Sequence, residues 1–154
     1  MSAAPYRFRT RWDLPVERGR LWEVVQDALA ADDPLPWWGR VRVEGRDDSA
    51  LHLVAESGLG YRLRFSIDQL ELNRPDTMTF RAAGDLVGRA VLRFVPFGRH
   101  RTLLLIEWDV DVTRPWMRRT DPVLRPVFGA AHAMVMSQGE RRFRRWLGDS
   151  SPGR

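Results

Sequence analysis

The sequence contains neither cysteine nor lysine, and it has no long apolar run. Without cysteine, disulfides and thiolate metal sites are excluded. Without lysine, a Walker-type phosphate loop, a Schiff base and a lysine general base are excluded. No segment approaches the roughly 20 apolar residues of a membrane-spanning helix, and Arg7, Arg9 and Arg11 stand where a signal peptide would need an apolar core. These absences predict a cytoplasmic protein without membrane insertion.

Several catalytic and cofactor motifs are also missing. The three histidines, His52, His100 and His132, have no metal-ligand spacing and no HExxH context. The segment Gly58-Leu-Gly60 lacks the third glycine and the following helix of a dinucleotide fingerprint. No serine lies in a GxSxG elbow. We therefore expect no metal and no cofactor.

All 25 basic residues are arginine, and they exceed the 20 acidic residues to give a net charge of +5. Such an excess favours polyanions in a general way. The arginines alternate with apolar or acidic residues, however, as in 62–64 and 89–93. This alternation is typical of the solvated face of a half-buried sheet. We expect no specific nucleic-acid partner, and an arginine-rich interaction module for RNA or an acidic protein, with a contiguous basic patch, is kept as an alternative.

A length of 154 residues fits one domain. We assign residues 1–148 to a single ligand-binding domain and residues 149–154 to a disordered tail. Alternation of Tyr6, Phe8, Thr10 and Trp12 with arginines predicts a first strand. A helix follows over 15–29, opened by Pro15, with Asp13 as a candidate cap.

From Val41 the period changes to that of strands. Six further strands are predicted, over 41–43, 51–55, 61–67, 78–82, 88–94 and 104–110. The short connections between them indicate an antiparallel meander. In the last strand, Glu107, Asp109 and Asp111 alternate with apolar residues, so we expect them to form charge pairs with arginines of neighbouring strands.

The C-terminal part predicts one long helix over 126–147, preceded by a bend or short helical turn in 113–122. Its residues cluster on one side at 100° per residue: Phe128, His132, Val135, Met136, Gly139, Phe143 and Trp146. A helix with so broad an apolar face has to lie across the sheet. The predicted fold class is α+β, and a sheet curved around one helix leaves a hollow between them.

This order of elements resembles the START-like superfamily and, within it, the polyketide cyclase/dehydrase and lipid-transport group called SRPBCC. The resemblance covers nearly the whole chain and rests on loose motifs: 15–22, Trp37-Trp38, Gly84-Asp85-Leu86 with Gly88, and the C-terminal His132, Met136, Gly139-Glu140 and Leu147. It implies a helix-grip fold, in which a seven-stranded curved antiparallel sheet wraps around the C-terminal helix and encloses a cavity for apolar ligands. Members include ligand carriers and aromatic-ring cyclases, so the resemblance implies fold more than chemistry.

The predicted ligand-binding residues face each other across this hollow. They are Trp38, Tyr61, Leu63, Phe65, Met78, Phe80, Ala90, Leu92, Ile106, Trp108, Phe128, His132, Val135 and Met136. The alternative is that they fill a solid core. Three small residues, Gly88, Ala90 and Gly139, indicate either close backbone packing or space for a ligand, because glycine inside a strand or helix costs about 0.5–1 kcal/mol relative to alanine.

His132 is the candidate polar residue of this hollow. It either bonds a strand residue structurally, orients a ligand carbonyl, or acts as a general base. Trp37 and Trp38 either anchor their loop or stack on a planar ligand. The main hypothesis is a monomer or homodimer that binds an apolar, ring-containing small molecule. An enzyme of the cyclase or dehydrase kind, using His132 with Tyr61, is the alternative within this fold.

Overall fold

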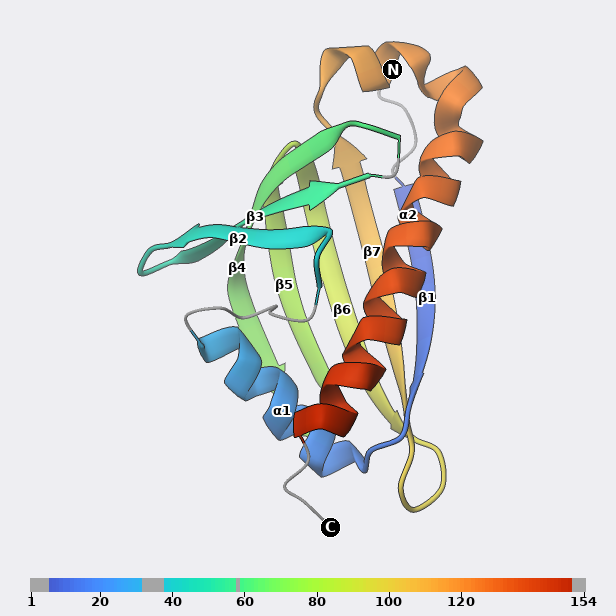
Figure 1. The fold of residues 1–154 in the computed structure, drawn as a ribbon. Coiled ribbons are helices and arrows are strands. Elements are labelled where there is room, and N and C mark those ends of the chain that lie inside the picture. Colours follow the sequence, from blue (N-terminus) through green and yellow to red (C-terminus); the bar gives the residue numbers. More distant parts are fainter. Residues whose placement is uncertain (1–5, 32–37, 58, 151–154) are drawn as a thin grey trace.

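The computed structural model describes residues 6–31, 38–57 and 59–150. A sheet curves around one long helix, and a shorter helix lies across one end of the sheet (Figure 1). The elements in chain order are β1 (Tyr6–Leu14), α1 (Arg18–Ala30), β2 (Val41–Arg46), β3 (Ala50–Glu56), β4 (Arg62–Asn73), β5 (Thr77–Gly84), β6 (Leu86–Pro96), β7 (Thr102–Val112) and α2 (Pro115–Ser150).

The strands form one seven-stranded antiparallel sheet in the order β1-β7-β6-β5-β4-β3-β2. The predicted meander from β2 to β7 is confirmed, since each of these strands pairs with the next along the chain. The first strand joins the far edge, where Tyr6 pairs with Val110 and Leu14 with Thr102. This long-range pairing places the N-terminal aromatic residues beside β7.

Two register shifts help the sheet to curve. One lies in β2 between Val43 and Gly45, and the other in β4 between Asp68 and Glu71. At the second, Gln69 adopts a positive φ of 50°. Bulges of this kind bend a strand and increase its twist. The sheet therefore forms a cup, and α2 runs across its hollow side (Figure 1).

The first helix starts later than predicted. Its N-cap is Glu17, whose carboxylate accepts hydrogen bonds from the backbone N–H groups of Gly19 and Arg20. The expectation that Asp13 caps a helix opened by Pro15 is wrong, because Asp13 belongs to β1 and its carboxylate is bound by Arg101. A capping carboxylate can reach the free N–H groups of a first turn only from the residue just before it.

The second helix starts earlier than predicted, at Pro115 instead of Pro126. Pro115 fits the first helical position, because the N–H that proline lacks has no partner there. Pro122 and Pro126 lie inside α2, and the ribbon changes direction in this region (Figure 1). The prolines thus bend the helix without ending it. The helix continues to Ser150, past the predicted start of the tail at Asp149.

The outer face of the sheet carries the predicted charge pairs. Arg9 lies 3.1 Å from Asp109 and 3.9 Å from Glu107, and Arg93 lies 3.6 Å from Glu107. Asp111 is exposed, and no ion pair to it occurs among the described residues. In the described ranges, neither helix combines the length and apolar character needed to cross a bilayer.

Gly88 shows close packing and not an opening for a ligand. A Cβ atom at this position would lie 2.0 Å from the carbonyl oxygen of Asp109 and 2.8 Å from the Cα of Val110. Both atoms belong to the backbone of β7, which pairs with β6. Only glycine allows the two strands to approach so closely here.

We expect Gly88→Ala to lower the free energy of unfolding by about 3 kcal/mol, the upper end of the range for overpacking, because backbone atoms cannot move aside. Urea denaturation followed by circular dichroism measures this change. Gly45→Ala is the matched control, since no heavy atom lies within 4 Å of its Cβ position, and it should change stability by less than about 1 kcal/mol. Equal effects of the two substitutions would contradict the close approach at Gly88.

Candidate ligand-binding cavity

The apolar interior consists of three separate clusters. The first contains Trp12, Trp22 and Phe143. The second contains Tyr6, Met117 and Phe128. The third lies on β3, β4 and β5 and includes Leu53, Phe65 and Ala82. Trp108 of β7 is half-buried and packs against all three, which places it at the centre of the hollow.

A cavity of about 240 Å³ lies between the sheet and the helices. Every predicted ligand-binding residue except Ala90 lines it: Trp38, Tyr61, Leu63, Phe65, Met78, Phe80, Leu92, Ile106, Trp108, Phe128, His132, Val135 and Met136. The sheet thus turns one face of each strand toward the same space. Of the two interpretations, a space of this volume favours a cavity over a solid core.

Ala90 is buried but does not line the cavity. It pairs with Phe80 on one side and with Trp108 on the other. The rings of Phe80 and Trp108 meet edge to face, with their centroids 5.5 Å apart. The short side chain of Ala90 leaves room for this contact, and Ala90 is the predicted ligand-binding residue that does not line the cavity.

The sequence prediction omitted several lining residues. Tyr6, Phe8 and Trp12 of β1 line the cavity, and their alternation with arginines was the signal that could have identified them. The residues of α1 that line it, Val25, Ala28 and Leu29, carried no such signal. Their position depends on where α1 packs against the sheet.

At one end of the cavity, α2 packs tightly against tryptophan side chains. A Cβ atom at Gly139 would lie 2.7 Å from Cε2 of Trp38 and 3.0 Å from Cζ2 of Trp12. The two indoles contact each other edge to face at 5.7 Å. Trp38 therefore packs against α2 and β1 and also lines the cavity. Trp37 lies outside the described residues.

At the other end, Asp121 of α2 is only 5% exposed and has two partners. The Tyr6 hydroxyl donates a hydrogen bond to one carboxylate oxygen, and Nε of Arg125 lies 3.1 Å from the other. The Arg125 guanidinium also lies over the Tyr6 ring, 4.1 Å from its centroid. Burial and the Asp121 carboxylate raise the pKa of Tyr6 far above its usual range, so the hydroxyl stays protonated.

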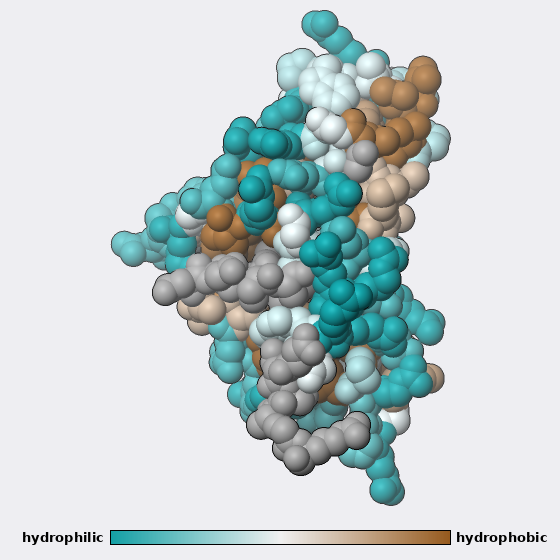
Figure 2. All heavy atoms as spheres, viewed as in Figure 1, coloured by the Kyte–Doolittle hydropathy of each residue, from teal (hydrophilic) through white to brown (hydrophobic). Residues whose placement is uncertain are grey.

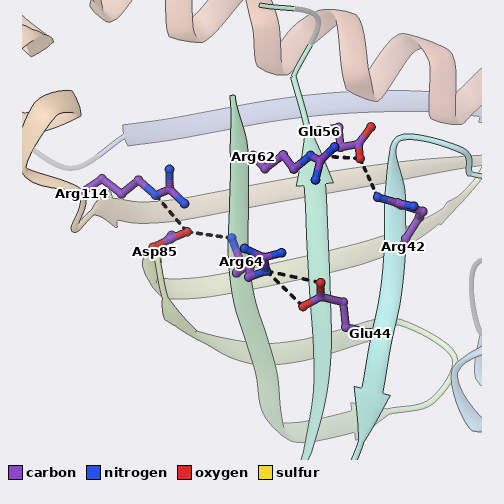
Figure 3. Close-up of polar contacts among 7 residues, drawn as sticks. All are labelled: Arg42, Glu44, Glu56, Arg62, Arg64, Asp85 and Arg114. Carbon is purple, nitrogen blue, oxygen red and sulfur yellow. Dashed lines mark hydrogen bonds and ion pairs between the residues drawn. The ribbon is translucent and has the colours of Figure 1, made fainter. Parts of the chain in front are cut away.

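Ion pairs tie together the strand ends beside the cavity (Figure 3). Glu56 is the charged residue among the described lining residues, and its Oε1 lies 2.6 Å from Arg42 and 3.4 Å from Arg62. Asp85 accepts a hydrogen bond from the backbone N–H of Arg64 at 2.8 Å and lies 3.2 Å from Nε of Arg114. The Asp85 contacts connect β4 to the residue that precedes α2.

His132 lies on α2 and lines the cavity. Its ring stacks on Phe8, with centroids 3.8 Å apart and planes inclined by 10°. Among the described residues, no side chain or backbone group forms a hydrogen bond with it. Burial lowers its pKa from 6.5 to about 4, so the imidazole is neutral at pH 7. The strand partner expected in the purely structural interpretation is therefore missing from the described part of the chain.

No protein-family model matches the sequence, and no curated protein matches it. Solved structures are similar over nearly the whole chain. A START superfamily protein of Mycobacterium smegmatis superposes with a TM-score of 0.64 at 16% identity, over 93% of this chain and 97% of that chain. A conserved protein of Geobacillus kaustophilus gives 0.74 at 11% identity, over 94% and 97%. A protein of Thermus thermophilus gives 0.66 at 16% identity, over 95% and 100%.

The chain has a START-like helix-grip fold. The predicted fold class is thereby confirmed: a seven-stranded curved antiparallel sheet and a long C-terminal helix. Identities this low establish the fold and leave the chemistry to the residues of this chain. In this START-like fold, no group of three or more His, Asp or Glu side chains within the described ranges is placed to hold a metal ion.

The burial of His132 predicts a pH-dependent stability. Between pH 6.5 and 4 the unfolded chain binds a proton that the folded chain does not, so the free energy of unfolding falls as the pH is lowered through this window. At 1.36 kcal/mol per pKa unit, His132 accounts for a loss of roughly 3 kcal/mol between pH 7 and pH 4.

The variant His132→Phe keeps a ring on Phe8 and removes the titrating group. Urea denaturation at several pH values should show that its stability, relative to wild type, improves by roughly 3 kcal/mol from pH 7 to pH 4. Met134→Phe, at an exposed position of the same helix, removes no titrating group and should run parallel to wild type. Parallel curves for His132→Phe as well would show that His132 is not buried in the neutral form.

Proposed function

We propose that this protein binds an apolar, ring-containing small molecule in the cavity between its sheet and α2. The observation that carries this proposal is the cavity of about 240 Å³ whose walls are almost entirely aliphatic and aromatic side chains. Apolar side chains that face empty space lack packing contacts, and this lowers the stability of the fold. An apolar ligand in the cavity would supply those contacts.

The size of the cavity supports a compact ligand. A volume of 240 Å³ lies just below the usual range for ligand pockets, about 300–1,000 Å³. This volume favours a small ring compound over a lipid with long acyl chains. Aromatic side chains of the cavity wall also favour a ring compound, because aromatic rings pack well against each other edge to face or offset. Trp108 already makes such edge-to-face contacts with Phe65 and Phe80.

Two observations favour binding over turnover. A general acid or base works best with a pKa near the operating pH, whereas the pKa of His132 is lowered to about 4. Tyr61, the partner considered for a cyclase or dehydrase, contacts Trp116 and Phe128, while His132 stacks on Phe8. We therefore propose a binding protein.

The arrangement of arginines also argues against an interaction module for RNA or an acidic protein. Several arginines on the strands lie beside acidic residues, as Arg64 does beside Glu44 and Arg9 beside Asp109. Such pairing reduces the positive potential that a polyanion would need.

A substitution that fills the cavity tests the proposal. Val135 lines the cavity from α2, so Val135→Trp should place an indole in the space for the ligand. The neutral dye N-phenyl-1-naphthylamine, whose fluorescence rises in apolar surroundings, serves as the probe. Because the indole would occupy the space that the dye needs, we expect the affinity to fall by at least about tenfold, which corresponds to about 1.4 kcal/mol.

Val123→Trp is the matched control on the same helix. Val123 is 78% exposed and belongs to α2 near its bend, where hydrophobic side chains gather on the surface (Figure 2). This variant should bind the dye as wild type does. Unchanged affinity in Val135→Trp, with its folding verified by circular dichroism, would show that the dye binds elsewhere and would contradict the proposed site.

A further inference from the structure

The cavity wall contains few polar groups, and most of them already have partners. The Tyr6 hydroxyl donates to Asp121. The Glu56 carboxylate lies between two arginines. The Ser57 hydroxyl oxygen accepts a hydrogen bond from the backbone N–H of Leu59 at 3.0 Å. His132 differs from these groups, because no hydrogen bond to it occurs in the described part of the chain.

The ring nitrogens of His132 are neither hydrogen-bonded nor fully enclosed among the described residues. Buried polar atoms without a partner do occur in this fold, at Oε1 of Gln138 for example, but the nitrogens of His132 are not among them. Having no partner and not being sealed between side chains, they border open space. His132 is half-buried and its ring lines the cavity, which points to the cavity as this space.

A neutral imidazole offers one N–H donor and one nitrogen acceptor. Its orientation in the cavity is fixed by the parallel stack on Phe8, so little conformational freedom would be lost when a ligand binds. A buried donor and acceptor without partners cost free energy. A ligand that supplies a complementary group would remove this cost.

The lack of positive charge in the cavity wall limits which polar group a ligand can place beside His132. The chain has no lysine, and none of the described lining residues is an arginine. A carboxylate placed in the cavity would lose its hydration without gaining a cation, which is strongly unfavourable. A hydroxyl or a carbonyl group has no such penalty.

We propose that His132 is the polar anchor of the cavity and that the ligand class is a neutral ring compound with a single hydroxyl or carbonyl group. This assignment rests on the proposed function, since it presumes that a small molecule occupies the cavity. It selects against organic acids and gives the ligand one orientation, with its polar group at α2 and its apolar body toward Trp108 and the strands.

Three naphthalene compounds of similar size test the assignment by isothermal titration calorimetry at pH 7.5. They are 2-naphthol, 2-methylnaphthalene and naphthalene-2-carboxylate. The first two differ only by a hydroxyl in place of a methyl group, so the ratio of their dissociation constants isolates the hydrogen bond. One hydrogen bond contributes about 0.5–1.5 kcal/mol. In His132→Phe, the affinity for 2-naphthol relative to that for 2-methylnaphthalene should therefore fall by roughly two- to tenfold.

Two further variants complete the design. His100→Phe makes the same chemical change at an exposed position outside the cavity and should leave the ratio as in wild type. His132→Gln restores a donor and an acceptor and should recover part of the preference for 2-naphthol. In wild type, the ¹⁵N resonances of the His132 ring should shift with 2-naphthol and not with 2-methylnaphthalene, which tests the contact without any substitution.

The outcomes separate the two proposals. If the naphthalenes bind but the ratio is the same in wild type and His132→Phe, His132 is not the anchor, while the proposed function stands. If naphthalene-2-carboxylate binds as tightly as 2-naphthol, the restriction to neutral ligands is wrong. If none of the three compounds binds to wild type, the proposed function fails, and the assignment of His132 fails with it.

Discussion

The attachment of α2 to the sheet at two separated places is the constraint on which the cavity depends. Near the C-terminal end of the helix, Gly139 allows contact with Trp12 and Trp38 at distances that no side chain would permit. Near the other end, Asp121 is held by the hydroxyl of Tyr6. Because both attachments involve side chains of β1, Trp12 at one end and Tyr6 at the other, the helix is fixed along the edge of the sheet that β1 forms. The stretch between them includes His132, which stacks on Phe8 of β1 and also lines the cavity.

Large aromatic residues keep this space open by packing against each other. Trp108 contacts Phe65 and Phe80 edge to face, and Ala90 between the strands leaves room for the second of these contacts. Rings held in this way cannot collapse into the cavity without losing their aromatic contacts, each of which contributes about 0.5–1.5 kcal/mol beyond its burial. The residues that shape the cavity are therefore also the ones that stabilise its walls.

The sequence predicted the strands well because alternation is local: the face that a residue of β4 or β7 occupies follows from its position in the strand. It failed where the outcome depended on contacts distant in the chain. The start of α2 was missed because Pro122 and Pro126 normally end helices, and here the helix bends past them. The lining residues of α1 were missed because no local pattern says where that helix packs. Ala90 was predicted to line the cavity because it lies on the face of β6 that points toward it. In the structure, the rings of its larger neighbours Phe80 and Trp108 meet beside it.

The distribution of charge explains why one neutral residue is more informative about a ligand than the 25 arginines. Arginine stays charged in proteins and is therefore placed where water or an acid can meet it, as on the outer face of the sheet. Its abundance follows from the solvated faces and says little about the interior. Histidine can enter the interior because it can give up its charge. The cost of doing so is recovered only if the ring nitrogens find partners, and among the described residues none forms a hydrogen bond with His132.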